Sequence, residues 1–295
     1  MQKISEYDAF GPWVYEITEE HPLPPLFEPY FPTDEPFEMA FKIPREIERR
    51  KATPDMDLYD YVVAAFSDRI LILTRQDKAV EETWVSYEGI ESVRLYRRML
   101  YGVCTLYLRQ SRVEIPFNVV SVDILMRFIR LVRAKLLADA PAYDIPQSLP
   151  DSALGEVLFV NLLRDLRDAG EQFALGAVQK DIVVRDQKQS FVQTAIQVFR
   201  PKRLMSAMHL INGRELLVIR RGSGGQKARD SEYSYDYTYI PRRNIREISL
   251  HADEQLAGVT VCSVWLTHHR FDWQFGADNE AATAFYQALQ ENMIR

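Results

Sequence analysis

Basic and aromatic side chains gather in one stretch of the chain, between residues 220 and 243. The arginines and a lysine surround a Gly-rich loop, RGSGGQKARDSEY, and the tyrosines alternate along the strand candidate that follows it. Cationic groups attract phosphates and carboxylates, and aromatic faces stack on bases or insert among lipid headgroups. The candidate surface for an anionic ligand or a partner comprises Arg220, Arg221, Lys227, Arg229, Tyr235, Tyr237, Arg242 and Arg243.

The same stretch has a plainer interpretation. Tyrosines at alternate positions share one face of a strand, so they would form a half-buried sheet surface beside a solvated loop. The net charge of −6 weighs against a nucleic-acid interface, because nucleic-acid binders usually carry a dominant basic patch. We therefore expect no nucleic acid as a partner, and the case for a membrane surface is weak.

No other group of residues has the spacing of a catalytic or metal site. The sequence contains no CxxC, HExxH or GxSxG pattern, and the glycines at 222–225 lie between strand candidates rather than before a helix. His268 and His269 are adjacent at a hairpin tip, where neighbouring side chains point apart. Cys104 and Cys262 fall on the apolar sides of their strands, where burial disfavours a reactive thiolate. A disulfide between them would need the two cores to touch, so we expect none. We predict no enzyme activity, no cofactor and no metal.

The elements that position these residues occur twice. Residues 104–118 read CTLYLRQSRVEIPFN, and residues 262–276 read CSVWLTHHRFDWQFG. Apolar residues alternate along each copy, which indicates half-buried strands in a hairpin, and each copy precedes a segment with helical spacing, at 121–137 and 278–293. Residues 69–75 match residues 214–220 in a similar way. Four identities recur without a gap: Cys104, Leu108, Arg112 and Phe117 match Cys262, Leu266, Arg270 and Phe275.

Each copy therefore holds several short antiparallel strands and one closing amphipathic helix. This order of elements resembles the pleckstrin-homology-like (PH-like) superfold, and specifically its tandem bacterial versions. The resemblance implies an α+β fold in which each unit is a bent antiparallel sheet or partial barrel closed by a C-terminal helix. It also implies a binding or scaffolding platform. The superfold's phosphoinositide site uses basic residues after the first strand, whereas the turns here, Ser67-Asp68 and Asn212-Gly213, carry none beyond Arg69 and Arg214.

The repeat divides the chain into four segments. We expect PH-like domains at 51–140 and 202–295, separated by an insert at 141–201 with a helix from Asp151 or Ser152 to about Asp168 and a strand candidate at 191–199. Residues 1–50 are rich in proline and aromatic residues, so they should form an extended arm that packs on its own protein or on a partner. The sequence has no apolar run of membrane length and no secretory signal, so we expect a cytoplasmic protein.

These patterns favour a non-enzymatic cytoplasmic protein-interaction or scaffold protein with tandem PH-like domains. The alternative is a peripheral binder of anionic lipid, or of another anionic ligand, through the basic loop of the second domain. The expected partner is a protein, which includes a second copy of the chain, because an aromatic arm and open sheet edges can both pair. A third interpretation is an enzyme whose site forms between the domains, and no motif supports it.

Overall fold

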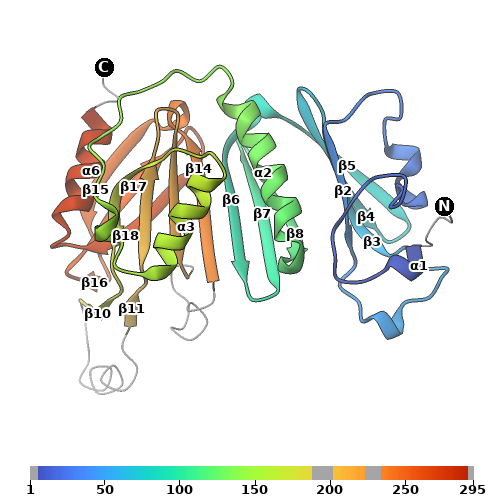
Figure 1. The fold of residues 1–295 in the computed structure, drawn as a ribbon, viewed down its shortest axis with the longest axis horizontal. Helices are drawn as coiled ribbons and strands as arrows, with labels where there is room; N and C mark the ends of the chain where they lie inside the picture. The colour runs from blue at the N-terminus through green and yellow to red at the C-terminus, as the bar shows by residue number, and fades with distance from the viewer. Residues whose placement is uncertain (1–5, 188–201, 223–233, 292–295) are drawn as a thin grey trace. The chain divides into compact units, whose positions relative to one another are not determined.

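A computed structural model of the chain describes residues 6–187, 202–222 and 234–291. In this part of the chain the protein is a mixed α+β structure of mostly antiparallel sheets, with few helices and no closed barrel (Figure 1). The chain divides into two compact units. The first comprises Met1–Ile90, Arg97–Leu106 and Arg112–Ala138, and the second comprises Glu91–Tyr96, Tyr107–Ser111 and Asp139–Arg295.

A five-stranded antiparallel sheet with the order β1-β2-β3-β4-β5 forms much of the first unit. Its strands are β1 (Tyr15–Glu16), β2 (Met39–Pro44), β3 (Tyr59–Ala65), β4 (Arg69–Gln76) and β5 (Ala79–Ser86). The Pro-rich segment supplies β1 and β2, together with α1 (Glu6–Ala9) and the 3₁₀ helix η1 (Pro25–Tyr30), and η2 (Arg49–Lys51) follows. The segment packs on its own unit, because Phe10, Phe27 and Phe31 join the same core as Tyr59 and Phe66.

Three further strands and a helix complete the first half of the sequence. After the 3₁₀ helix η3 (Tyr87–Gly89), strands β6 (Ile90–Arg98), β7 (Tyr101–Leu108) and β8 (Arg112–Asn118) are consecutive neighbours. The 3₁₀ helix η4 (Val119–Ser121) then leads into helix α2 (Val122–Leu137), which lies along the β7–β8 hairpin in Figure 1. Leu125, Phe128 and Val132 are buried at helical spacing, as expected for this segment.

The second half of the sequence begins with the insert. It forms η5 (Asp151–Leu154), helix α3 (Val157–Asp168), and the strands β9 (Ala174–Gln179) and β10 (Ile182–Asp186). The expected helix from residue 151 to 168 is interrupted at Gly155, whose φ of 67° ends η5 in the left-handed region. Strand β10 pairs with β11 (Lys202–Leu204) and β16 (Leu256–Ala257) in a small sheet. The strand candidate at 191–199 lies outside the described residues.

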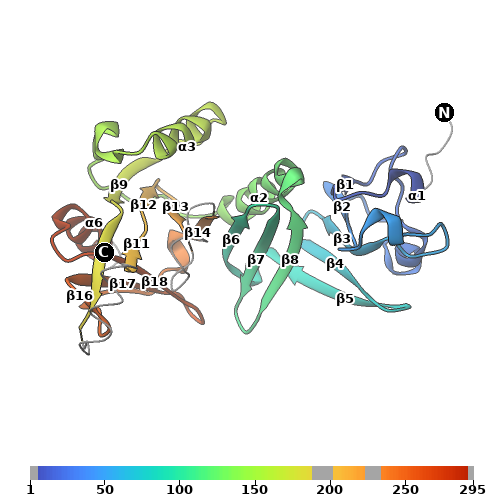
Figure 2. The same ribbon diagram turned by 90° about the horizontal axis from the view of Figure 1, so that it is seen from below.

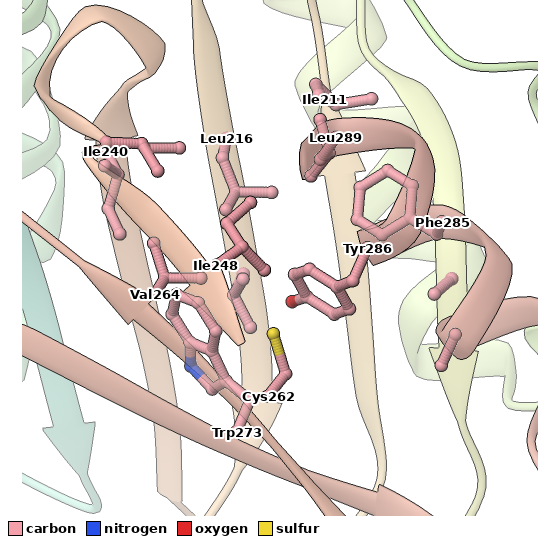
Figure 3. Packing of buried hydrophobic residues seen from close by; sticks show 14 of the residues in the cluster. Ile211, Leu216, Ile240, Ile248, Cys262, Val264, Trp273, Phe285, Tyr286 and Leu289 are labelled. Atoms are coloured by element: carbon pink, nitrogen blue, oxygen red, sulfur yellow. The ribbon is translucent and has the colours of Figure 1, made fainter. Parts of the chain in front are cut away.

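Two larger groups of strands and a terminal helix make up the rest of the second unit. The first group runs in the order β9-β12-β13-β14, with β12 (Ala207–Ile211), β13 (Glu215–Arg221) and β14 (Ser234–Pro241) (Figure 2). After η6 (Arg242–Asn244), the second group runs in the order β15-β17-β18, with β15 (Glu247–Ala252), β17 (Val259–Trp265) and β18 (Arg270–Gly276). Helix α6 (Glu280–Glu291) then covers a core that contains Cys262, Trp273 and Tyr286 (Figure 3).

The order of elements in the two halves agrees. The first half reads β2-β3-β4-β5, then β6-β7-β8, then α2, and the second half reads β9-β12-β13-β14, then β15-β17-β18, then α6. Both hairpins close with the same backbone bond, from Leu108 N to Ser111 O at 2.9 Å and from Leu266 N to His269 O at 2.8 Å. The sequence repeat therefore corresponds to a repeated arrangement of four antiparallel strands, three antiparallel strands and one helix.

Side-chain contacts recur in the two hairpins as well. Arg112 Nε lies 3.0 Å from Glu114 Oε1, and the matching residues Arg270 and Asp272 form the same pair at 2.6 Å. Cys104 and Cys262 are fully buried free thiols, which confirms their assignment as small apolar residues of the two cores.

The hairpin predicted at Asn212-Gly213 is present, but its turn lies one residue further along the chain. Asn212 N donates to Glu215 O at 3.0 Å, so Gly213 and Arg214 are the two central residues. The Asn212 side chain accepts the Arg214 and Glu215 amides, both at 2.8 Å. Asparagine therefore acts here as a side-chain acceptor at the start of the turn and not as a residue with positive φ.

Gly102 in β7 makes room for an aromatic ring of the first core. A Cβ atom at this position would lie 2.4 Å from Cζ of Phe117, which is 5% exposed. We expect Gly102→Ala to lower the free energy of unfolding by roughly 1–3 kcal/mol, because the ring must leave its place in a packed core. Gly89→Ala is the matched control, because no atom lies within 4 Å of its Cβ position. Urea unfolding of both variants measures the difference, and equal stabilities would contradict this packing.

Candidate functional site

The residues of the predicted basic and aromatic surface lie on three elements of the second unit. Arg220 and Arg221 end β13, and Tyr235 and Tyr237 lie in β14. Arg242 and Arg243 lie in η6. Lys227 and Arg229 lie outside the described residues. Register brings part of the group together, because Arg221 is the partner of Tyr235 and Arg220 is the partner of Asp236 between β13 and β14.

Arg220 is bound to a buried carboxylate that the sequence did not single out. Asp236 is 1% exposed, and its Oδ2 lies 2.9 Å from a terminal nitrogen of Arg220. A second guanidinium, that of Arg94 in β6, makes two bonds of 2.8 Å to the two carboxylate oxygens. Burial alone would raise the pKa of Asp236, but the charges and hydrogen bonds of the two arginines hold it below its ordinary value.

This Arg94–Asp236–Arg220 cluster connects strands from the two copies of the repeat. Residues Glu91–Tyr96 of β6 belong to the second unit, where β6 is the neighbour of β14. Sequence reasoning missed the cluster because Arg94 and Asp236 are 142 positions apart. The one available signal was an aspartate between two tyrosines in a strand, a place where a buried carboxylate needs a partner.

Arg221 and Arg242 are also engaged within the second unit. Arg221 lies 3.4 Å from Glu156 Oε2, beside the start of α3. Arg242 is 5% exposed, donates to the carbonyl of Asp144 at 2.9 Å, and stacks over the Tyr143 ring at 4.8 Å. Burial lowers the pKa of Arg242. Arg242 thus fastens the beginning of the insert to the β12–β13 turn, where Tyr143 N also donates to Gly213 O at 2.8 Å.

The two tyrosines differ in exposure. Tyr237 is 5% exposed and belongs to the interior, whereas Tyr235 and Arg243 are half-buried. Of the six described members of the predicted surface, Arg220, Arg221 and Arg242 already have acidic or carbonyl partners in the fold. The described residues therefore form a structural cluster around Asp236 and Arg242, in which three of the four described arginines of the predicted surface are hydrogen-bonded inside the protein.

The first unit carries a shallow, open pocket of about 400 Å³. The amide of Val14 donates to Ser121 Oγ at 2.9 Å, which holds the N-terminal segment against the start of α2. Trp13 is 49% exposed and Val120 is 52% exposed, so the rim presents apolar surface to solvent. The lining is mostly apolar with one carboxylate, a composition that is common in small binding pockets. The lining residues are Trp13, Val14, Tyr15, Val120, Ser121, Asp123 and Ile124.

The core of the second unit contains a buried polar group beneath α6. His209 is 1% exposed, and its Nδ1 lies 2.6 Å from the hydroxyl of Tyr286. The same hydroxyl hydrogen-bonds Cys262, and Figure 3 shows the Tyr286 ring and the Cys262 side chain next to each other. Burial, aided by the charge of Arg220, lowers the pKa of His209 to about 3. Burial also raises the pKa values of Tyr286 and Cys262. All three groups are therefore neutral at physiological pH, and their role is structural.

The remaining candidates for chemistry are also occupied by the fold. Burial raises the pKa of Cys104 to about 12, so neither cysteine is a nucleophile at neutral pH. His268 Nδ1 lies 2.9 Å from Glu91 Oε1, and His269 Nε2 lies 2.5 Å from Leu108 O. Within the described ranges, no three His, Cys, Asp or Glu side chains converge in a way that could hold a metal ion.

The chain matches no protein-family model and no curated protein sequence. Among the helices in the described part of the chain, none combines the length and the apolar composition needed to cross a bilayer.

Proposed function

We propose that the chain is a non-enzymatic cytoplasmic protein-interaction or scaffold protein with two PH-like domains. The resemblance of the sequence to that superfold implies that each domain is a bent antiparallel sheet or partial barrel closed by a C-terminal helix. The antiparallel strands that precede α2 and α6 support this. The observation that carries the proposal is the pairing of β6 with β14, in which a strand of one repeat extends a sheet of the other. This is strand addition, the way in which several binding domains of antiparallel sheet recognise proteins.

Open strand edges and an apolar pocket support the same function. Strands β5 and β15 each end their sheet in the described part of the chain, and the Trp13 pocket adds an exposed aromatic anchor. Edge strands and exposed aromatic residues are the features that protein partners use.

The second candidate in the sequence analysis, binding of an anionic lipid or ligand, receives less support. Arg220, Arg221 and Arg242 are engaged within the fold. An anion could bind Arg220 or Arg242 only after it displaced the Asp236 carboxylate or the Asp144 carbonyl. This candidate stays a prediction that depends on Lys227, Arg229 and Arg243.

Two measurements on the full chain test the proposal. Chemical cross-linking in a native extract, followed by peptide mass spectrometry, is expected to give cross-links from a partner protein to residues of β5, β15 or the Trp13 pocket. Sedimentation with vesicles rich in phosphatidylserine is expected to leave the chain in the supernatant. Salt-sensitive sedimentation that is lost in Arg243→Ala and Lys227→Ala would contradict the proposal and favour the anionic ligand.

A further inference from the structure

Strands β5 and β15 are among the strands that end a sheet in the residues that the structure describes. Strand β5 ends the five-stranded sheet of the first unit, and β15 ends the β15-β17-β18 sheet of the second. Neither strand contains proline, and β5 carries Val80, Thr83 and Trp84, which favour extended structure. An edge strand of this length presents backbone donors and acceptors that another strand can pair with.

The chain contains one example of how such strands pair. Strand β14 is the fourth strand of the second repeat, and β6 is the fifth strand of the first repeat, and the two are neighbours. Strand β5 is the fourth strand of the first repeat, and β15 is the fifth strand of the second repeat. The paired strands and the open strands are therefore both a fourth strand and a fifth strand. They differ in which repeat supplies each of the two.

The flanks of the two pairs correspond, and so do the lengths of the fourth strands. Strands β5 and β14 each have eight residues, and each is followed by a three-residue 3₁₀ helix, η3 or η6. Strand β15 has six residues and β6 has nine, and both come directly after or close to that 3₁₀ helix. The open edges thus match the paired ones in their place along the repeat.

The register identifies the equivalent residues. Glu81 pairs with Thr74 of β4 and stands six positions before η3, as Asp236 pairs with Arg220 of β13 and stands six positions before η6. Counting from the same 3₁₀ helices, Ser249 in β15 takes the place of Arg94 in β6. The neighbouring residues agree, because Val93 and Ile248 are 0% and 1% exposed.

We propose that the chain binds a second copy of itself by adding β15 of one copy to β5 of the other, in the same way that β6 adds to β14. This inference rests on the proposed function and names the partner. A second copy fits because both complementary strands, the fourth of the first repeat and the fifth of the second, lie on this one chain. The contact joins unlike surfaces, so repeated association gives rings or open chains.

The pairing between copies is weaker than the pairing inside the chain. Within the chain, Arg94 and Asp236 make two bonds of 2.8 Å at the junction, whereas the equivalent pair, Ser249 and Glu81, has no opposite charge. Association is therefore expected to grow with protein concentration, and Ser249→Arg is expected to strengthen it. A half-buried ion pair corresponds to about three- to tenfold in the dissociation constant.

Disulfide trapping tests the geometry of the full-length chain. Arg94 and Asp236 bond directly within the chain, so the equivalent residues Ser249 and Glu81 should lie on adjacent strands, where neighbouring residues come within reach of a disulfide. Glu81→Cys protein mixed with Ser249→Cys protein is expected to give a covalent dimer on mild oxidation. The native thiols do not interfere, because both are buried. The matched control, Glu114→Cys mixed with Ser249→Cys, should not cross-link, because Glu114 lies on β8.

Sedimentation equilibrium tests the energetics. Ser249→Arg should tighten association, Ser249→Glu should weaken it, and Glu81→Arg combined with Ser249→Glu should restore it. A chain that stays monomeric in the wild type and in Ser249→Arg, with no covalent dimer from the Glu81→Cys and Ser249→Cys mixture, would overturn the inference. Association that is indifferent to all three substitutions would overturn it too, because it would use another surface. In either case, cross-links from a different protein to β5 or β15 would leave the proposed function intact. If no such cross-links form, both this inference and the proposed function are wrong.

Discussion

Asp236→Ala is expected to lower the free energy of unfolding by about 3 kcal/mol. The substitution leaves two guanidiniums, those of Arg94 and Arg220, facing each other at 26% side-chain exposure without the carboxylate between them. Removal of one member of a buried ion pair costs more than the pair itself contributes, because the remaining charge is desolvated and unpaired. Because water has partial access to the two arginines, we expect a loss near the lower end of the values found when a buried ion pair is broken. Urea unfolding at neutral pH measures it.

Glu114→Ala is the matched control for this experiment. Glu114 also pairs with an arginine, but both side chains of the Arg112–Glu114 pair are more than half exposed. Exposed pairs contribute about 0–1 kcal/mol, so this variant should unfold near the wild type. The Asp236 cluster has no structural importance if Asp236→Ala loses no more stability than Glu114→Ala.

Acidification is expected to destabilise the protein between about pH 6.5 and pH 4.5 through His209. The folded-state pKa is about 3, and the ordinary value is 6.5, so above pH 6.5 the ring is neutral in both states and contributes no slope. Below pH 6.5 His209 binds a proton in the unfolded chain but not in the folded chain. The free energy of unfolding therefore falls by up to about 1.4 kcal/mol per pH unit. The slope ends as the pH approaches 3.

His209→Gln isolates this contribution. Glutamine keeps an acceptor for the Tyr286 hydroxyl but does not titrate, so the slope between pH 6.5 and pH 4.5 should largely disappear. Asp236, Asp253 and Asp272 have lowered pKa values, and their contribution is lost only as the pH falls further, below about 4.5. An unchanged slope in His209→Gln would mean that the buried imidazole is protonated in the folded state.

Local periodicity and the repeat predicted much of the fold. Helix α2 and the β7–β8 and β17–β18 hairpins follow the apolar spacing of their own residues, because each buries one face against a core. The places of Cys104 and Cys262 followed from the repeat alone. The finer assignment of both halves to the PH-like superfold stays a proposal.

Other features depend on contacts between distant segments, which a single sequence does not reveal. The proline-rich segment looked like an arm, yet β1 and β2 pair in register with each other and with β3, because residues 39–44 find their partner in residues 59–65. Gly155 divides the helix expected from residue 151, since a left-handed residue satisfies the end of η5.

The candidate site illustrates the same limit. Arginines and alternating tyrosines suggested an anionic-ligand surface, because the sequence shows charge but not the groups that neutralise it. Arg220 pairs with Asp236 nearby in the chain, but Arg221 and Arg242 find their partners, Glu156 and the Asp144 carbonyl, in the insert. The strand pairing on which the proposed function depends was invisible, because β6 and β14 belong to different copies of the repeat.

Amide hydrogen exchange of the dilute full-length chain tests most directly whether the protein works through strand addition. Residues 91–96 should be protected as strongly as β13, because β6 has neighbours on both sides, whereas outward amides of β5 and β15 should exchange quickly and become protected as the protein is concentrated. Residues 91–96 that exchange as fast as β5 in the dilute chain would show that the two repeats do not pair by this strand, and the account would be wrong.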